Sequence, residues 1–236
     1  MNEKNKPLLI AHRGANKDAP ENTLKAFKKA IELKADYVEF DVHGSKDHEI
    51  VIMHDADTFR TTGHKGKIEE MTLRELKELD CGEGEQIPTL QELIEVAKGK
   101  IGLQCEIKAE GIAEKVIEIL RGANLIDSTI ISSFKHDELI KIKKIEPQAK
   151  LAPLILGIRK NKTIREAIEY GFYAIHPLYK FAKEKFINAA HENNLKINVW
   201  TVDDRDTMEE LVNRSVDGII TNDVALGYAV IKEENP

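Results

Sequence analysis

The chain has 236 residues, of which 42% are hydrophobic and 32% charged, and its formal net charge is −6. This length suits one large α/β domain with a substantial core under a charged surface. The acidic balance argues against the basic face of a nucleic-acid-binding protein, so any phosphate ligand must be held locally. The longest apolar runs are strand-sized, which predicts no stable membrane insertion.

The N-terminal residues are charged and pass straight into an apolar strand, without the apolar segment and cleavage site of a secretion signal. This pattern predicts a cytoplasmic protein. Cys81 and Cys105 lack metal-ligand spacing, and we expect both to be free thiols. A monomer and a homodimer are equally compatible with the sequence.

Hydrophobic periodicity predicts eight strands that alternate with eight helices. The strands are expected at 8–12, 37–43, 101–107, 129–133, 150–155, 173–177, 196–202 and 218–221. The helices are expected at 22–34, 89–98, 111–122, 136–145, 161–170, 181–193, 204–213 and 223–232. Strict alternation in this length predicts an α/β fold, a closed (β/α)8 TIM barrel that forms a single domain over 1–236.

The first strand ends at His12 and Arg13, and the chain then enters the first helix through residues 20–23. We interpret that second segment as a helix start, with Asn22 or Thr23 as the N-cap. A proton-transfer group and a fixed cation therefore lie side by side at a strand end.

A small insertion is expected at 44–88, after the second strand, because this stretch is too long for an ordinary βα loop. Its apolar run ends at His54, and a helix is predicted over 72–79 with Thr72 as N-cap and Glu75 completing a capping box. Loops that follow barrel strands build the active site. The insertion should therefore bring His54 to the barrel mouth.

His12 and His54 both end apolar, strand-like runs. Imidazole titrates near neutral pH, so we predict that the two rings act as an acid and base pair, with either assignment of roles open. Four histidines in charged or loop contexts are expected to be structural or on the surface: His48, His64, His136 and His191. His176 and Tyr179, near the sixth strand, are the weakest site candidates.

Strand phase brings three carboxylates together. Glu39 and Asp41 are two positions apart on the second strand and point the same way, and Glu106 enters the barrel from the third strand. Burying such a group without a cation is costly, and oxygen ligands alone suit a divalent metal, Mg²⁺ or Ca²⁺, rather than zinc. We predict Glu39, Asp41 and Glu106 as metal ligands.

Four further side chains are predicted to bind substrate. Arg13 offers a planar fork for phosphate oxygens, and Lys108 adds a point charge. An alternative for the carboxylates is that they pair only with these two cations. Phe134 lies just past the fourth strand and Trp200 at the end of the seventh, and both could cover the apolar face of a small alcohol, although core packing explains them almost equally well.

Seven short motifs occur in a fixed order, and together they resemble the bacterial short form of the glycerophosphodiester phosphodiesterase family over essentially the whole chain. The motifs are HRG at 12–14, ENT at 21–23, EFDV at 39–42, MHD at 53–55, RTTG at 60–63, IPTL at 87–90 and EIK at 106–108. The resemblance implies a TIM barrel that holds calcium or magnesium on Glu39, Asp41 and Glu106, with His12 and His54 as acid and base and with Arg13 and Lys108 near the phosphate.

The implied activity is hydrolysis of a small-molecule glycerophosphodiester, such as glycerophosphocholine or glycerophosphoethanolamine, to sn-glycerol 3-phosphate and an alcohol. His43, Gly44 and the TVDD segment at 201–204 depart from the usual family pattern, which leaves the head group open. Direct attack by water and a cyclic phosphate intermediate both remain possible.

Two other functions fit the same barrel. One is a phosphodiesterase of the lysophospholipase D type, against which the lack of a secretion signal counts. The other is a non-catalytic barrel that binds a phosphate ligand, against which the intact histidines and carboxylates count.

Overall fold

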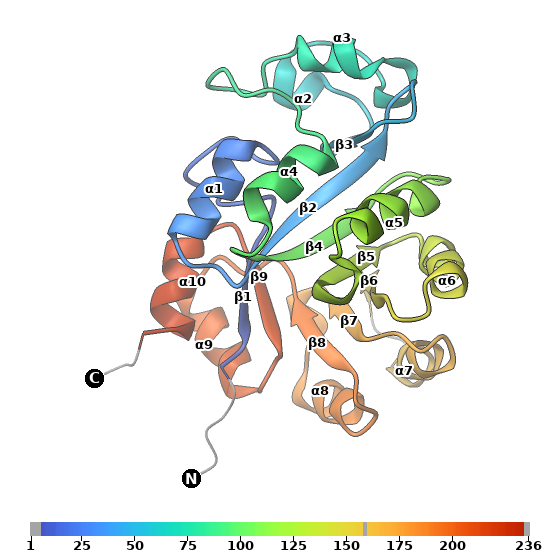
Figure 1. The fold of residues 1–236 in the computed structure, drawn as a ribbon. Helices are drawn as coiled ribbons and strands as arrows, with labels where there is room; N and C mark the ends of the chain where they lie inside the picture. The colour runs from blue at the N-terminus through green and yellow to red at the C-terminus, as the bar shows by residue number, and fades with distance from the viewer. Residues whose placement is uncertain (1–5, 158–159, 234–236) are drawn as a thin grey trace.

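The computed structural model describes residues 6–157 and 160–233, and at its centre eight parallel strands form a closed ring (Figure 1). β1 pairs with both β2 and β9, which closes the barrel. This architecture confirms the predicted fold class. Around the ring, the strands are β1 (Leu8–Ala11), β2 (Tyr37–Gly44), β4 (Gly102–Ile107), β5 (Thr129–Ser133), β6 (Lys150–Ile155), β7 (Ala174–Pro177), β8 (Lys196–Val199) and β9 (Gly218–Thr221).

Helices connect successive strands and surround the barrel (Figure 1). All eight predicted helices are present, with ends within three residues of the expected positions. They are α1 (Leu24–Glu32), α4 (Leu90–Ala97), α5 (Ala113–Gly122), α6 (His136–Ile145), α7 (Lys160–Glu169), α8 (Glu184–His191), α9 (Arg205–Asn213) and α10 (Val224–Ile231), joined by the short 3-10 turns η2 (Ile126–Ser128) and η3 (Tyr179–Phe181).

The main core lies between the barrel and the helices. On β2, Val38, Phe40 and Val42 are fully buried and face this layer, and the Phe40 ring meets Phe27 of α1 edge to face. The alternate residues of the strand must then point into the barrel. The carboxylates of the second strand are inward-facing for this reason.

The insertion lies beyond the end of β2, at the top of Figure 1. Its strand β3 (Ile50–Ile52) runs antiparallel to β2, and three short helices follow: α2 (Phe59–Thr62), η1 (Ile68–Glu70) and α3 (Leu73–Lys77). Thr72 caps α3 in the predicted capping box with Glu75. A separate apolar cluster stabilises the insertion: Val51, Met53, Ile68, Leu76 and Ile87.

Within the described residues, no helix is long and apolar enough to cross a membrane. Cys81 is partly buried and Cys105 is fully buried on β4, and both are free thiols as the sequence predicts.

Candidate active site

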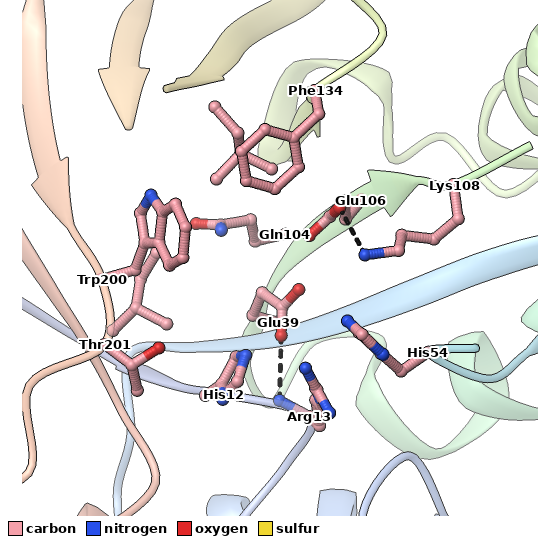
Figure 2. A pocket seen from close by; sticks show the side chains of 12 residues that line it. His12, Arg13, Glu39, His54, Gln104, Glu106, Lys108, Phe134, Trp200 and Thr201 are labelled. Atoms are coloured by element: carbon pink, nitrogen blue, oxygen red, sulfur yellow. Dashed lines mark hydrogen bonds and ion pairs between the residues drawn. The ribbon is translucent and has the colours of Figure 1, made fainter. Parts of the chain in front are cut away.

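A pocket of about 480 Å³ opens at the carboxyl ends of the barrel strands (Figure 2). Eight of the nine side chains singled out in the sequence line it, and the ninth, Asp41, is buried close to them with 1% of its surface exposed. The lining residues are His12, Arg13, Glu39, His54, Gln104, Glu106, Lys108, Phe134, Leu154, Trp200, Thr201 and Ile220.

The turn after β1 explains the HRG motif. Arg13 and Gly14 both adopt left-handed backbone conformations, with φ of 56° and 81°. A Cβ on Gly14 would lie 2.7 Å from the Cβ of Ala26 on α1, so the position requires glycine. The strained Arg13 backbone turns its N–H toward Glu39, and this N–H donates to Oε2 of Glu39 at 2.9 Å.

Glu39, Asp41 and Glu106 form a buried acidic cluster. Each contributes an oxygen to a group of atoms that all lie within 4.8 Å of one another, because Asp41 and Glu106 are register partners on β2 and β4. Burial, followed by the charges of Asp41 and Glu106, raises the pKa of Glu39 well above its usual value. Burial and Asp41 raise the pKa of Glu106 to about 7.

Two cations only partly offset this cluster. The Lys108 ammonium lies 2.8 Å from Oε1 of Glu106 and 3.5 Å from Oδ1 of Asp41, and Nε of Arg13 lies 3.5 Å from Oδ2 of Asp41. Burial alone would lower the pKa of Lys108, but Glu106 and Asp41 raise it overall. When all three carboxylates are ionised, they outnumber the two cations and leave an excess negative charge in a buried place. The donor set therefore fits a hard divalent cation.

His12 is held by an amide. Its Nδ1 lies 2.7 Å from Oδ1 of Asn222, whose Nδ2 donates to Asp203 at 2.7 Å. A carboxylate can only accept from the amide, so Oδ1 faces His12 and Nδ1 of His12 carries the hydrogen. Burial, and then the Arg13 charge, lower the pKa of His12. The neutral ring thus keeps an acceptor nitrogen, Nε2, for chemistry.

His54 is held from two sides. Its Nδ1 lies 2.6 Å from Oδ1 of Asp55, and its backbone carbonyl accepts a hydrogen bond of 3.2 Å from Nε2 of His43 on β2. Burial lowers the pKa of His43, which suits its role as a neutral donor. In Figure 2 the His54 ring points into the pocket, on the opposite side from Trp200.

An aromatic pair forms the opposite wall. Phe134 and Trp200 meet edge to face with ring centroids 5.5 Å apart, and the Trp200 indole donates to the His176 carbonyl at 2.8 Å. Phe134 is 42% exposed, so it is not a core residue. His176 is buried inside the barrel and does not line the pocket.

The other histidines also lie outside the pocket lining. His136 lies 3.1 Å from the Leu154 carbonyl and His191 lies 2.7 Å from Asp217, both through Nε2, which are structural contacts. His48 has a left-handed backbone in the turn after β2, and His64 belongs to the insertion.

The structure decides between the two predicted N-caps, Asn22 and Thr23. Thr23 is the N-cap of α1, through its hydroxyl and the Ala26 N–H. Asn22 instead has a left-handed backbone with φ of 57°, and its amide donates to Oδ2 of Asp41 at 2.9 Å. A helix-start pattern explains both neighbours equally in sequence, and only the backbone conformation separates them.

Comparison with known proteins assigns the chain to a family. The model of the glycerophosphoryl diester phosphodiesterase family matches residues 12–226. The chain belongs to this family. A glycerophosphodiester phosphodiesterase of Caldanaerobacter subterraneus subsp. tengcongensis is 39% identical over 231 residues, covering 92% of this chain and 95% of that protein.

Two solved structures of the family are also similar to the chain. A glycerophosphodiester phosphodiesterase from Thermotoga maritima is 33% identical with a TM-score of 0.81, covering 93% of this chain and 96% of that one. A phosphodiesterase from Oleispira antarctica, solved in complex with the product sn-glycerol-3-phosphate, is 29% identical with a TM-score of 0.89, covering 97% and 98%. The chain is thus similar to members of this phosphodiesterase family over nearly its full length.

The sequence alone did not indicate the roles of three polar residues that hold His12 and His54 in place. Asn222 and Asp203 lie about 200 residues from His12 in sequence, so no local pattern links them. Strand phase puts His43 on the inward face of β2 with Glu39 and Asp41, but nothing in the sequence indicates that it binds the His54 carbonyl.

Proposed function

We propose that the chain hydrolyses glycerophosphodiesters to sn-glycerol 3-phosphate and an alcohol, with a divalent metal, Mg²⁺ or Ca²⁺, and in the cytoplasm. The observation that carries the proposal is the convergence of His12, His54 and the three carboxylates on one pocket. The product named in the Oleispira antarctica structure supports the substrate class.

Glu39, Asp41 and Glu106 would hold the metal. When bound, the metal offsets negative charge on the phosphate and orients its oxygens. With the ion present, these three carboxylates and the two cations Arg13 and Lys108 leave one positive charge in the site. A phosphodiester carries one negative charge, so the substrate neutralises the pocket.

Arg13 and Lys108 bind the phosphate's non-bridging oxygens. Arg13 is aligned by the left-handed turn and by its contact with Glu21, where Nη1 lies 3.0 Å from Oε1. Fixed donors of this kind stabilise charge that develops in the transition state without reorganising.

His12 accepts, on Nε2, the proton of the hydroxyl whose oxygen attacks phosphorus, because its ring is neutral and only Nδ1 is engaged by Asn222. That hydroxyl is either water or the substrate's own neighbouring hydroxyl, and in the second case water then opens the cyclic phosphate. His54 donates a proton to the leaving alcohol oxygen through Nε2, while Asp55 holds Nδ1. Each role contributes about 10² to 10⁴ in rate. Phe134 and Trp200 contact the alcohol on the far wall of the pocket.

The test is a coupled assay of glycerol 3-phosphate released from glycerophosphocholine by the wild type, His12→Ala and His54→Ala. Release by the wild type that falls at least about 10²-fold in both variants is expected. Release that both variants retain would overturn the mechanism. Choline released only from lysophosphatidylcholine would favour the lysophospholipase D function, and no turnover of either substrate would favour a binding protein.

A further inference from the structure

Arg60, the first residue of the RTTG motif, joins the insertion to the barrel. It lies on α2, and its guanidinium donates to both carboxylate oxygens of Glu21, with Nη2 2.6 Å from Oε1 and Nη1 3.0 Å from Oε2. Its Nε donates to Oδ2 of Asp55 at 2.5 Å. Glu21 lies in the turn between β1 and α1, so one side chain connects the two parts of the molecule.

The same contacts continue to the reactive groups on both sides. Asp55 uses its second oxygen, Oδ1, to hold Nδ1 of His54. Glu21 shares Oε1 between Arg60 and Nη1 of Arg13. An unbroken chain of polar contacts therefore runs from the phosphate-facing Arg13 to the ring of His54.

This network differs from an ordinary surface ion pair, which contributes little. The Arg60–Glu21 pair is bidentate, the geometry that gives ion pairs strength and direction. The hydrogen bonds that Arg60 donates to Glu21 raise the pKa of Arg60. Burial alone would raise the pKa of Glu21, but its bonds with Arg60 and Arg13 lower it overall, so both partners are charged at neutral pH.

Other contacts fix only the backbone near His54. The Met53 N–H donates to the Asp41 carbonyl at 3.0 Å, and His43 binds the His54 carbonyl. Among the described residues, the His54 ring itself is oriented by Asp55. Removing Arg60 should thus leave the insertion folded and release the ring.

We propose that Arg60 and Glu21 form a latch that fixes Asp55 and thereby aims His54, which makes Arg60 a positioning residue. The inference rests on the proposed function, because it takes His54 to be catalytic. A misplacement of about 1 Å at a reacting group can cost 10²-fold in rate. The expected effect is on kcat, since Arg60 aligns a catalytic ring and does not itself bind the substrate.

The experiment measures kcat and KM for glycerophosphocholine in Arg60→Gln, Glu21→Gln and the double variant. Arg121→Gln is the matched control, because Arg121 forms an exposed pair with Glu146 away from the pocket. We expect kcat of Arg60→Gln to fall about 10- to 100-fold with KM changed less than about threefold. The double variant should lose no more kcat than the single variant with the larger loss, because both substitutions remove the same interaction.

A kcat for Arg60→Gln equal to that of Arg121→Gln would overturn the latch, as would a raised KM with unchanged kcat, which would make Arg60 a substrate contact. A second readout is independent of turnover: the ¹⁵N NMR spectrum of the His54 ring should show a hydrogen-bonded Nδ1–H in the wild type, and this signature of the bond to Asp55 should weaken in Arg60→Gln and Glu21→Gln. An unchanged spectrum would also refute the latch. An inactive wild type whose spectrum still responds would refute the proposed function alone.

Discussion

Replacing Asn222 with leucine tests how His12 is prepared for proton transfer. The side chain of Asn222 accepts from Nδ1 of His12 at 2.7 Å, and leucine has a similar size but no acceptor. The substitution therefore removes the hydrogen bond that fixes the tautomer, while the metal ligands are untouched.

The size of the effect follows from burial. His12 is partly buried, and a donor left without a partner in such a place costs about 1–3 kcal/mol. The ring can avoid that cost by rotating or by moving its hydrogen to Nε2, and either change removes the acceptor nitrogen from the pocket. Since about 1.4 kcal/mol is a factor of ten, kcat should fall roughly 10- to 100-fold.

The assay is glycerol 3-phosphate release, with kcat and KM determined separately. Asn16→Ala is the matched control, because Asn16 donates to the same Oδ1 of Asn222 at 2.6 Å without contributing the acceptor that His12 needs. It should change kcat by less than about threefold, since one hydrogen bond between partly buried side chains contributes little net free energy. An Asn222→Leu enzyme as fast as Asn16→Ala would refute the reasoning.

Three further predictions address stability, metal and substrate. Burial lowers the pKa of His176 to about 3, so below pH 6.5 the unfolded state takes up a proton that the folded state does not. The wild type should therefore lose about 1.4 kcal/mol of unfolding free energy per pH unit below 6.5. Denaturant titrations at pH 7.5 and 5.5 should show this loss in the wild type and not in His176→Gln, and an equal loss in both proteins would contradict it. Calorimetric titration with Mg²⁺ or Ca²⁺ should show that Glu106→Gln binds the metal at least about tenfold more weakly than the wild type, while Glu110→Gln binds it as the wild type does. Equal affinities in Glu106→Gln and the wild type would remove Glu106 from the ligand set. Phe134→Ala should raise KM for glycerophosphocholine about two- to fivefold at unchanged kcat, because it removes an exposed contact between an aromatic ring and the ammonium of choline. An unchanged KM would place the head group elsewhere.

The sequence predicted the barrel because its elements are regular. Each strand is a short apolar run with a helix of clear period after it, so counting the alternation was enough. Phase along β2 and β4 also predicted that Glu39, Asp41 and Glu106 point inward, since the period of a strand is fixed. These features depend only on local geometry.

The parts that the sequence did not predict depend on contacts between distant segments or on the backbone. Asn22 is not the N-cap because its backbone is left-handed, a conformation that asparagine tolerates and that hydrophobic periodicity does not predict. Asn222 reaches His12 because β9 closes the ring against β1. Arg60 reaches Glu21 only because the insertion contacts the turn between β1 and α1.

The most direct test of the central claim is glycerol 3-phosphate release from glycerophosphocholine before EDTA, after EDTA, and after Mg²⁺ or Ca²⁺ is returned in excess. If Glu39, Asp41 and Glu106 hold a metal that the reaction needs, EDTA should abolish release and one of the two ions should restore it. Full activity in EDTA would contradict the account.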